Sequence, residues 1–221
     1  MLIGSLARYV ALTGFVALLA GSQGSALSFT CVRNSGFLES QCLIGEAQFS
    51  ASVSDLGGGQ VSITFANAGP TASIIADVYV DDDAGVFSSI GSVLDGAGTD
   101  FEIGASPGNL PGGNEVTPVF SANFSADAEP PTGTNGNGAD PGESFSLIMN
   151  LAGGKTFADA QGAFELGTTR LGIHGQGLGA TGGSQAFVTG GGGGENAVPE
   201  PTAALLFGLG LVAVSRRVRR G

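Results

Sequence analysis

Short stretches in which apolar and polar residues alternate run through the middle of the chain. In Gln60–Phe65 the apolar residues share one face, as the two-residue period of a half-buried strand requires. Ala47–Ser54 alternates in the same way, and the glycine-rich stretch Asp55–Gly59 between the two predicts a hairpin. Further strands are expected at Ile74–Val80, Val86–Ile90, Thr99–Ile103, Val116–Phe124, Ser144–Leu151, Thr169–His174 and Ser184–Val188.

One segment follows a helical period instead. Thr156–Leu166 places its apolar residues on one stripe, with Thr156 as the N-terminal cap and Gly167 as the stop. Pro, Gly, Asn and Asp are concentrated in three stretches that predict loops, namely Leu94–Gly98, Gly104–Asn114 and Glu129–Gly142. Many short strands, frequent turns and one short helix predict an all-β fold, a single antiparallel β-sandwich over residues 27–189.

The N-terminal residues have the order of a secretory signal peptide. Met1–Arg8 carries one positive charge, Tyr9–Ala20 is apolar, and small residues at Gly24–Ala26 suit cleavage by signal peptidase. The apolar part is shorter than the roughly 20 residues that span a bilayer. Residues 1–26 are therefore expected to be removed, which leaves the following residues outside the cytoplasm.

The other end of the chain has a different three-part order. A glycine-rich linker at 190–197 is expected to be flexible and leads into Val198, Pro199, Glu200 and Pro201. An apolar run, Thr202–Ser215, follows, and four arginines then predict a membrane stop on the cytoplasmic side: Arg216, Arg217, Arg219 and Arg220. As a helix this run is about 21 Å long, against about 30 Å for the hydrocarbon core. It therefore predicts a temporary anchor in the inner membrane.

These C-terminal residues, 198–221, resemble the PEP-CTERM sorting signal of Gram-negative bacteria, which has a Pro-Glu-Pro motif, a short transmembrane helix and an arginine-rich tail. The resemblance implies processing by exosortase, a membrane transpeptidase, near the motif. It also implies that the body of the protein passes on to the cell surface or the extracellular matrix. Fixed proline dihedrals keep the motif extended, as a protease substrate requires.

The body between the two ends is strongly acidic. Residues 27–198 contain 18 Asp or Glu, and their only basic residues are Arg33, Lys155 and Arg170, so the formal charge is −15. Nucleic acid and anionic lipid both need a basic protein surface, so neither is expected as a partner of the body.

Cys31 and Cys42 are the only cysteines, with ten residues between them. In an oxidising compartment such a pair most simply forms a disulfide. A closed zinc site would need further ligands, and the spacing is not the Cys-x-x-Cys of a redox pair.

Catalytic chemistry finds little support in the sequence. His174 is the only histidine and is expected at the surface or rim of a strand, with no nucleophile motif beside it. The run Asp81–Asp83 is expected to form a solvated turn; in the alternative interpretation Asp81 and Asp83 bind calcium weakly. The chain has no Trp and two Tyr, which disfavours stacking on sugar rings.

Two hypotheses follow. The first is an exported protein without enzymatic activity or cofactor, retained at the surface or in a biofilm matrix among exopolysaccharide. The second is a secreted polysaccharide-binding or hydrolytic β-sandwich with a structural calcium ion. Binding to polysaccharide gels, or melting that depends on calcium, would distinguish the second from the first.

Overall fold

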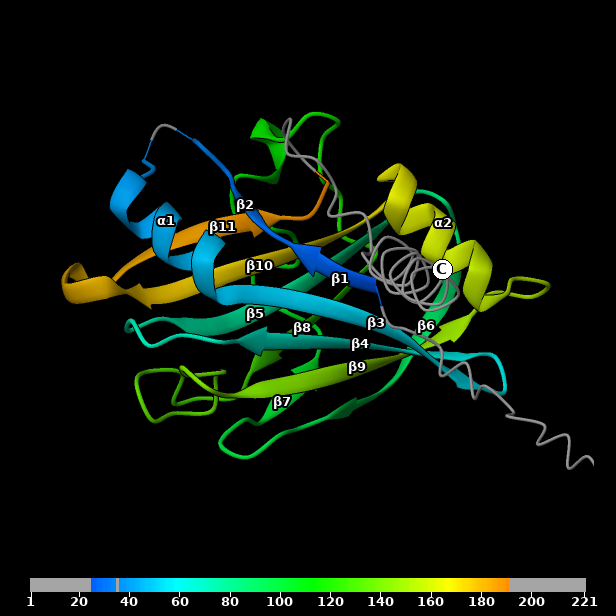
Figure 1. Cartoon of the computed structure of the whole chain (residues 1–221), viewed down its shortest axis with the longest axis horizontal. Coiled ribbons are helices and arrows are strands. Elements are labelled where there is room, and N and C mark those ends of the chain that lie inside the picture. Colours follow the sequence, from blue (N-terminus) through cyan, green and yellow to red (C-terminus); the bar gives the residue numbers. More distant parts are fainter. Residues whose placement is uncertain (1–24, 35, 191–221) are drawn as a thin grey trace, which may run out of the picture.

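The computed structural model describes residues 25–34 and 36–190, which fold into two packed antiparallel sheets (Figure 1). The first sheet has the order β1-β3-β4-β9-β6, formed by Ser25–Ser28, Phe49–Gly57, Gln60–Asn67, Ser144–Leu151 and Phe87–Leu94. The second has the order β2-β11-β10-β5-β8-β7, formed by Thr30–Cys31, Gly183–Val188, Thr169–Leu178, Ile74–Asp82, Phe124–Ala128 and Phe101–Ile103. The predicted all-β antiparallel architecture is confirmed.

The helices are α1, Glu39–Gln48, and α2, Phe157–Leu166, and two 3-10 turns lie at Gly113–Glu115 and Gly179–Thr181. The prediction of a single helix is therefore wrong, because α1 includes Ala47 and Gln48, which were assigned to a strand. No helix among the described residues has the length and apolar character needed to cross a bilayer. The predicted signal peptide up to residue 24, and the C-terminal sorting helix, lie outside the described residues.

The alternation of apolar residues places the core between the sheets. Val53, Ile63 and Phe65 from the first sheet and Ile173 and Phe187 from the second are all buried in one cluster. The rings of Phe49 and Phe187 meet edge to face across the sheets, with centroids 5.2 Å apart. The predicted hairpin is present as β3–β4, with positive φ at glycines 57–59 in the turn.

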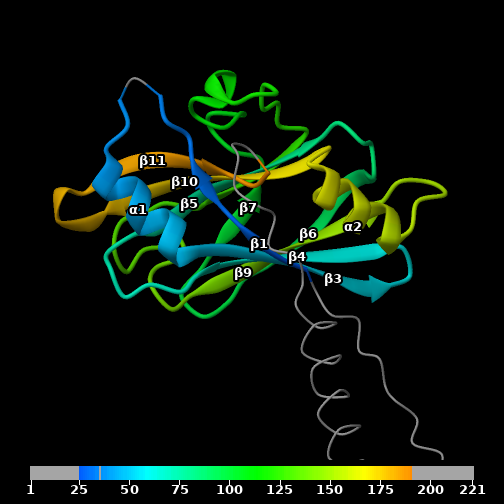
Figure 2. The same ribbon diagram turned by 45° about the horizontal axis from the view of Figure 1, so that its top comes forward.

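A second, smaller apolar cluster lies on the outer face of the second sheet. Leu110, Val116 and Phe120, from the connection between β7 and β8, cover Tyr79 of β5 and Val188 of β11. Figure 2 shows this green segment lying over β10 and β11. The prediction of a strand at Val116–Phe124 is wrong. The residues before Phe124 belong to a loop that straps the sheet, in which Val116 and Phe120 are buried and Val119 is exposed, and β8 begins only at Phe124. We refer to residues 104–123 as the strap.

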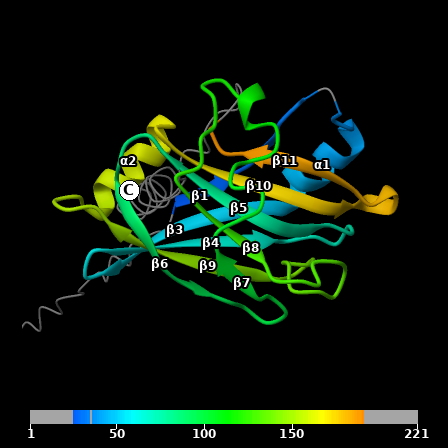
Figure 3. The same cartoon turned by 180° about the vertical axis from the view of Figure 1, so that it is seen from behind.

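The two ends of the sandwich differ in what they carry. At one end lie the β3–β4 turn, α2 and Gly190, where the description of the chain stops; we call this the exit end. The opposite end carries α1, the β10–β11 connection and the loops 95–100 and 129–143 (Figure 1). Figure 3 shows the side of the sandwich where β6 and β7 of the two sheets lie next to each other.

Candidate functional site

The last strand fixes the chain up to Thr189. The Thr189 amide donates to the Leu171 carbonyl, and the Leu171 amide donates to the Thr189 hydroxyl at 2.8 Å. Gly190 is exposed, and the linker continues from it. The predicted sorting residues Val198–Pro201 and the arginines 216, 217, 219 and 220 lie outside the described residues, so the fold places the start of the linker and not the motif itself.

The two cysteines form the predicted disulfide, which joins β2 to α1 with the Cα atoms 5.3 Å apart. Both cysteines are buried, and the Cys31 amide donates to Glu46 Oε1 of α1 at 2.9 Å. The bond thus attaches α1 to the edge strand of the second sheet, because β2 pairs with β11 over only two residues.

The aspartate run after Val80 is largely buried. Asp81 forms an ion pair with Arg170 of β10, and both side chains are at most 3% exposed. Asp82 accepts hydrogen bonds from the amides of Val86 and Phe87 and from the Thr169 hydroxyl. The prediction of a solvated turn is wrong for Asp81 and Asp82, because each carboxylate has fixed partners; only Asp83 is exposed.

The two residues predicted as weak calcium ligands lie in different environments, because Asp81 is buried against Arg170 and Asp83 is exposed. Burial raises the pKa of the Asp81 carboxyl above its ordinary value, while the hydrogen bond and charge of Arg170 act in the opposite direction. A carboxylate paired with arginine is a poor calcium ligand, because the guanidinium already neutralises it. Among the described residues no group of three or more His, Cys, Asp or Glu is placed to hold a metal ion.

Arg170 also holds the strap against the sheet, a role that the sequence pattern did not suggest. Its guanidinium donates to the carbonyls of Pro118 at 2.7 Å and Val119 at 2.8 Å, and it lies 5.4 Å from the centre of the Phe120 ring. Asp81 and Arg170 are 89 residues apart, so no local sequence pattern indicates that they pair. Only the register of β10 against β5 places them opposite each other.

His174 lies on the outer face of β10, directly opposite Asp77 of β5. Its Nδ1 is 2.6 Å from Asp77 Oδ2, and its side chain is 17% exposed, at the edge of a cleft of about 200 Å³. Ser184 lines the same cleft, but within the described residues no serine hydroxyl is hydrogen-bonded to the His174 ring. The geometry therefore orients a histidine at the rim of the strand, as predicted.

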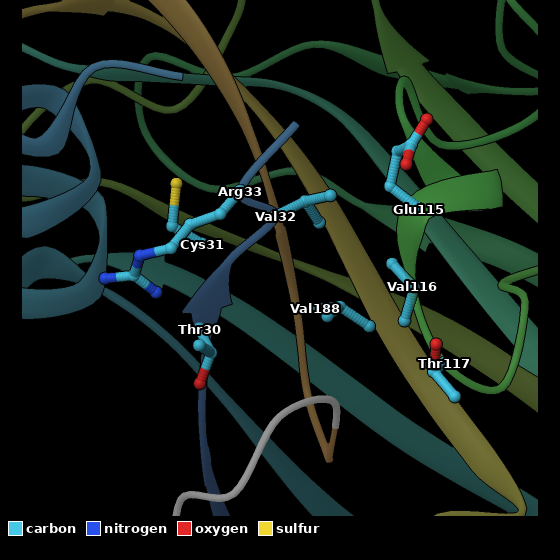
Figure 4. A pocket seen from close by; sticks show the side chains of 8 residues that line it. All are labelled: Thr30, Cys31, Val32, Arg33, Glu115, Val116, Thr117 and Val188. Carbon is cyan, nitrogen blue, oxygen red and sulfur yellow. The ribbon is translucent and has the colours of Figure 1, made fainter. Parts of the chain in front are cut away.

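A larger cleft of about 330 Å³ lies between β2 and the strap (Figure 4). Val32, Val116 and Val188 form its apolar floor, and the rim consists of the polar residues Thr30, Glu115 and Thr117. Figure 4 shows the Arg33 guanidinium directed toward the helix and away from Glu115. It lies 3.3 Å from Glu39 and 3.7 Å from Glu46. No aromatic ring lines this cleft, so it lacks the flat surface on which sugars usually stack.

Comparison with known proteins identifies the C-terminal segment. The model of the PEP-CTERM protein-sorting motif matches residues 197–220. The chain therefore carries a PEP-CTERM sorting motif, which indicates an exported protein held transiently at the membrane and implies exosortase as the processing partner. No curated protein and no solved structure matches the chain.

Proposed function

We propose that the protein is a non-enzymatic component of the cell surface or extracellular matrix, which exosortase releases from its temporary anchor. The sorting motif at residues 197–220 is the observation that carries this proposal. The acidic body supports it, since a formal charge of −15 favours solubility and mutual repulsion at a crowded surface. The Cys31–Cys42 disulfide is of the kind that persists outside the cytoplasm.

The outer surface of the domain supports a structural role more than a catalytic one. His174 has an orienting carboxylate but no hydrogen-bonded nucleophile among the described residues. The cleft beside β2 has an apolar floor and no aromatic ring. Neither feature favours the alternative of a calcium-stabilised polysaccharide-binding or hydrolytic module.

The proposal is tested by replacing Pro199, Glu200 and Pro201 with alanine in the full-length chain. We expect the variant to stay in the inner membrane, while the unchanged protein reaches the surface fraction only in cells that have exosortase. Release of the variant at the normal rate would contradict processing at this motif.

The role of the released body is tested separately with polysaccharide affinity gels and with melting scans in calcium or in a chelator. The matrix proposal predicts no retardation of migration and no change in melting temperature with calcium. A shift in either measurement would favour the binding module instead.

A further inference from the structure

The side of the first sheet that faces away from the core carries no charge (Figure 1). There, Thr64 of β4 lies between Ser52 of β3 and Ser146 of β9. The strands β1, β3, β4, β9 and β6 contain a single charged residue, Asp55, beside the β3–β4 turn. Asp55 is opposite the buried Val61, in register with the core-facing residues, so no outward position is charged. We call the residues that these five strands direct outward the neutral face.

The acidic residues gather on other surfaces. On the outer side of the second sheet, Asp77, Asp127 and Glu102 lie opposite one another on β5, β8 and β7. The body as a whole carries a formal charge of −15. Two copies that approach through such surfaces bring like charges together, whereas two neutral faces can meet without that repulsion.

Hydrogen bonds between side chains hold the neutral face in a fixed arrangement. The hydroxyls of Thr64 and Ser146 are hydrogen-bonded at 2.8 Å, the Gln60 side-chain amide donates to Asn150 Oδ1 at 3.0 Å, and Asn150 Nδ2 donates to the Ser89 hydroxyl at 2.9 Å. These bonds already satisfy polar groups within the face, so covering it leaves fewer of them without a partner. The side chains are also fixed before contact, so they lose little further conformational freedom on association.

The size of the neutral face suits a weak but specific contact. Its longer strands, β3, β4, β9 and β6, are each eight or nine residues long. With strands about 4.8 Å apart and a rise of about 3.3 Å per residue, these strands cover about 500 Å². Two such faces in contact bury about 1,000 Å² in total, which is near the lower limit for a specific interface. A complex formed in this way is expected to be reversible.

We infer that the neutral face is a self-association surface, on which a second copy of the chain places its own neutral face. Both copies use the same surface, so a twofold axis relates them and the association ends at a dimer. The charge of the body selects this partner, because a copy that is repelled by the acidic surfaces meets no like charge here. The inference goes beyond the proposed function and does not depend on how the sorting motif is processed.

The dimer is tested by sedimentation velocity on the full-length chain in detergent and on the exported form recovered from the cell surface or medium. We expect the dimer fraction to rise with protein concentration. At fixed concentration it should also rise with sodium chloride between about 20 and about 200 mM, because salt screens the repulsion between the two acidic bodies. A monomer at all concentrations up to about 1 mM, or a dimer that salt dissociates, would overturn the inference. Release from the membrane is measured separately, so a released monomer contradicts this inference and leaves the proposed processing intact.

Matched substitutions locate the contact. Ser52→Glu, on the neutral face, and Ser184→Glu, on β11 of the second sheet, each add one negative charge at an exposed serine. We expect Ser52→Glu to weaken dimerisation by about tenfold or more and Ser184→Glu by no more than about twofold, because only the first places two like charges in the contact.

Ser92→Glu, at an exposed outward position of β6, is a second variant of the neutral face and should act like Ser52→Glu. Thermal melting followed by circular dichroism shows which variants are folded. Equal weakening by Ser184→Glu and by a folded variant of the neutral face would place the contact elsewhere and overturn the inference.

Discussion

At the scale of single residues, the Asp81–Arg170 pair helps to hold the strap on the second sheet, beside the apolar contacts of Leu110, Val116 and Phe120. The pair is buried, and Arg170 also donates to two strap carbonyls, so Asp81 neutralises its charge and the strap accepts two of its hydrogen bonds. Removing one partner of a buried pair leaves an uncompensated charge, whereas replacing both by apolar residues removes that penalty.

We therefore expect Arg170→Met to lower the free energy of unfolding by about 3–5 kcal/mol. The double variant Arg170→Met with Asp81→Leu should regain a substantial part of this loss, although the strap carbonyls stay without their donor. Urea unfolding measures both, with Lys155→Met as the control at an exposed cation, expected within about 0.5 kcal/mol of the unchanged protein. A loss for Arg170→Met no larger than that control would contradict the structural role of the pair.

At the scale of elements, α2 begins and ends where local chemistry dictates. The Thr156 hydroxyl accepts from the Asp159 amide, the Asp159 carboxylate accepts from the Thr156 amide, and Gly167 ends the helix at a φ of 68°. These interactions form a capping box and a left-handed C-terminal cap, at the two residues that the sequence predicted as cap and stop, Thr156 and Gly167.

Thr156→Ala is expected to lower the free energy of unfolding by about 1 kcal/mol, because it leaves an amide of the first turn without a partner. Thr134→Ala, at an exposed loop threonine, is the matched control and should have little effect. Chemical denaturation followed by circular dichroism measures both. Equal stabilities of the two variants would show that the cap does not stabilise the domain.

The hydrogen bonds of this cap also make the stability of the domain depend on pH, and the direction of that dependence follows from the pKa of Asp159. Hydrogen bonds from the Thr156 side chain and amide lower the pKa of Asp159. Its contribution to stability is therefore complete above the ordinary carboxyl pKa and is lost as the pH falls through the lowered value. The stability difference between the unchanged protein and Asp159→Asn should be largest at neutral pH and should close in acid. A difference that grows as the pH falls would contradict this assignment.

Elements with strong local signals could be predicted from the sequence. The alternation in Gln60–Phe65 and Ser144–Leu151 gave β4 and β9, since a half-buried strand requires that pattern. α1 could not be predicted in this way. Its N-cap residue, Leu38, makes no side-chain cap, and Gly45 lies in its interior. That glycine is needed because a Cβ there would fall 2.1 Å from the ring of Phe187. Such a requirement comes from tertiary packing alone.

In the candidate site, too, features with a local sequence signal could be predicted, and features that depend on contacts between distant strands could not. The disulfide and the sorting motif follow from residue types and order, so the sequence was sufficient for both. The partners of Asp81 and His174 come from distant strands, and only the register of β10 against β5 shows them. The aspartate run was misjudged because a local stretch of charge gives no information about an arginine across the sheet.

At the scale of the whole molecule, the Cys31–Cys42 disulfide suits an exported protein, because such bonds persist outside the cytoplasm. The disulfide closes a short loop and fixes α1, which otherwise packs against the narrow edge formed by β2 and β11. We expect the double variant Cys31→Ser with Cys42→Ser to lose about 2.5–3 kcal/mol of stability. Denaturation in the presence of a reductant should reproduce that loss in the unchanged protein and leave the double variant unaffected. A variant as stable as the oxidised protein would show that the bond adds nothing to the fold.

The structure also bears on where the exported form begins. The predicted cleavage after Ala26 falls inside β1, of which Leu27 and Ser28 would still pair with Ala51 and Ser50. The exported body would then begin within β1, and the matched sorting motif lies at residues 197–220.

The most direct test of the central claim, release by exosortase from a temporary anchor, is the intact mass of the protein recovered from the cell surface or medium. The account predicts a chain that lacks the signal residues and the segment Arg216–Gly221, with a mass lowered by two hydrogens for the Cys31–Cys42 bond. A surface form that retains Arg220 and Gly221 would contradict it.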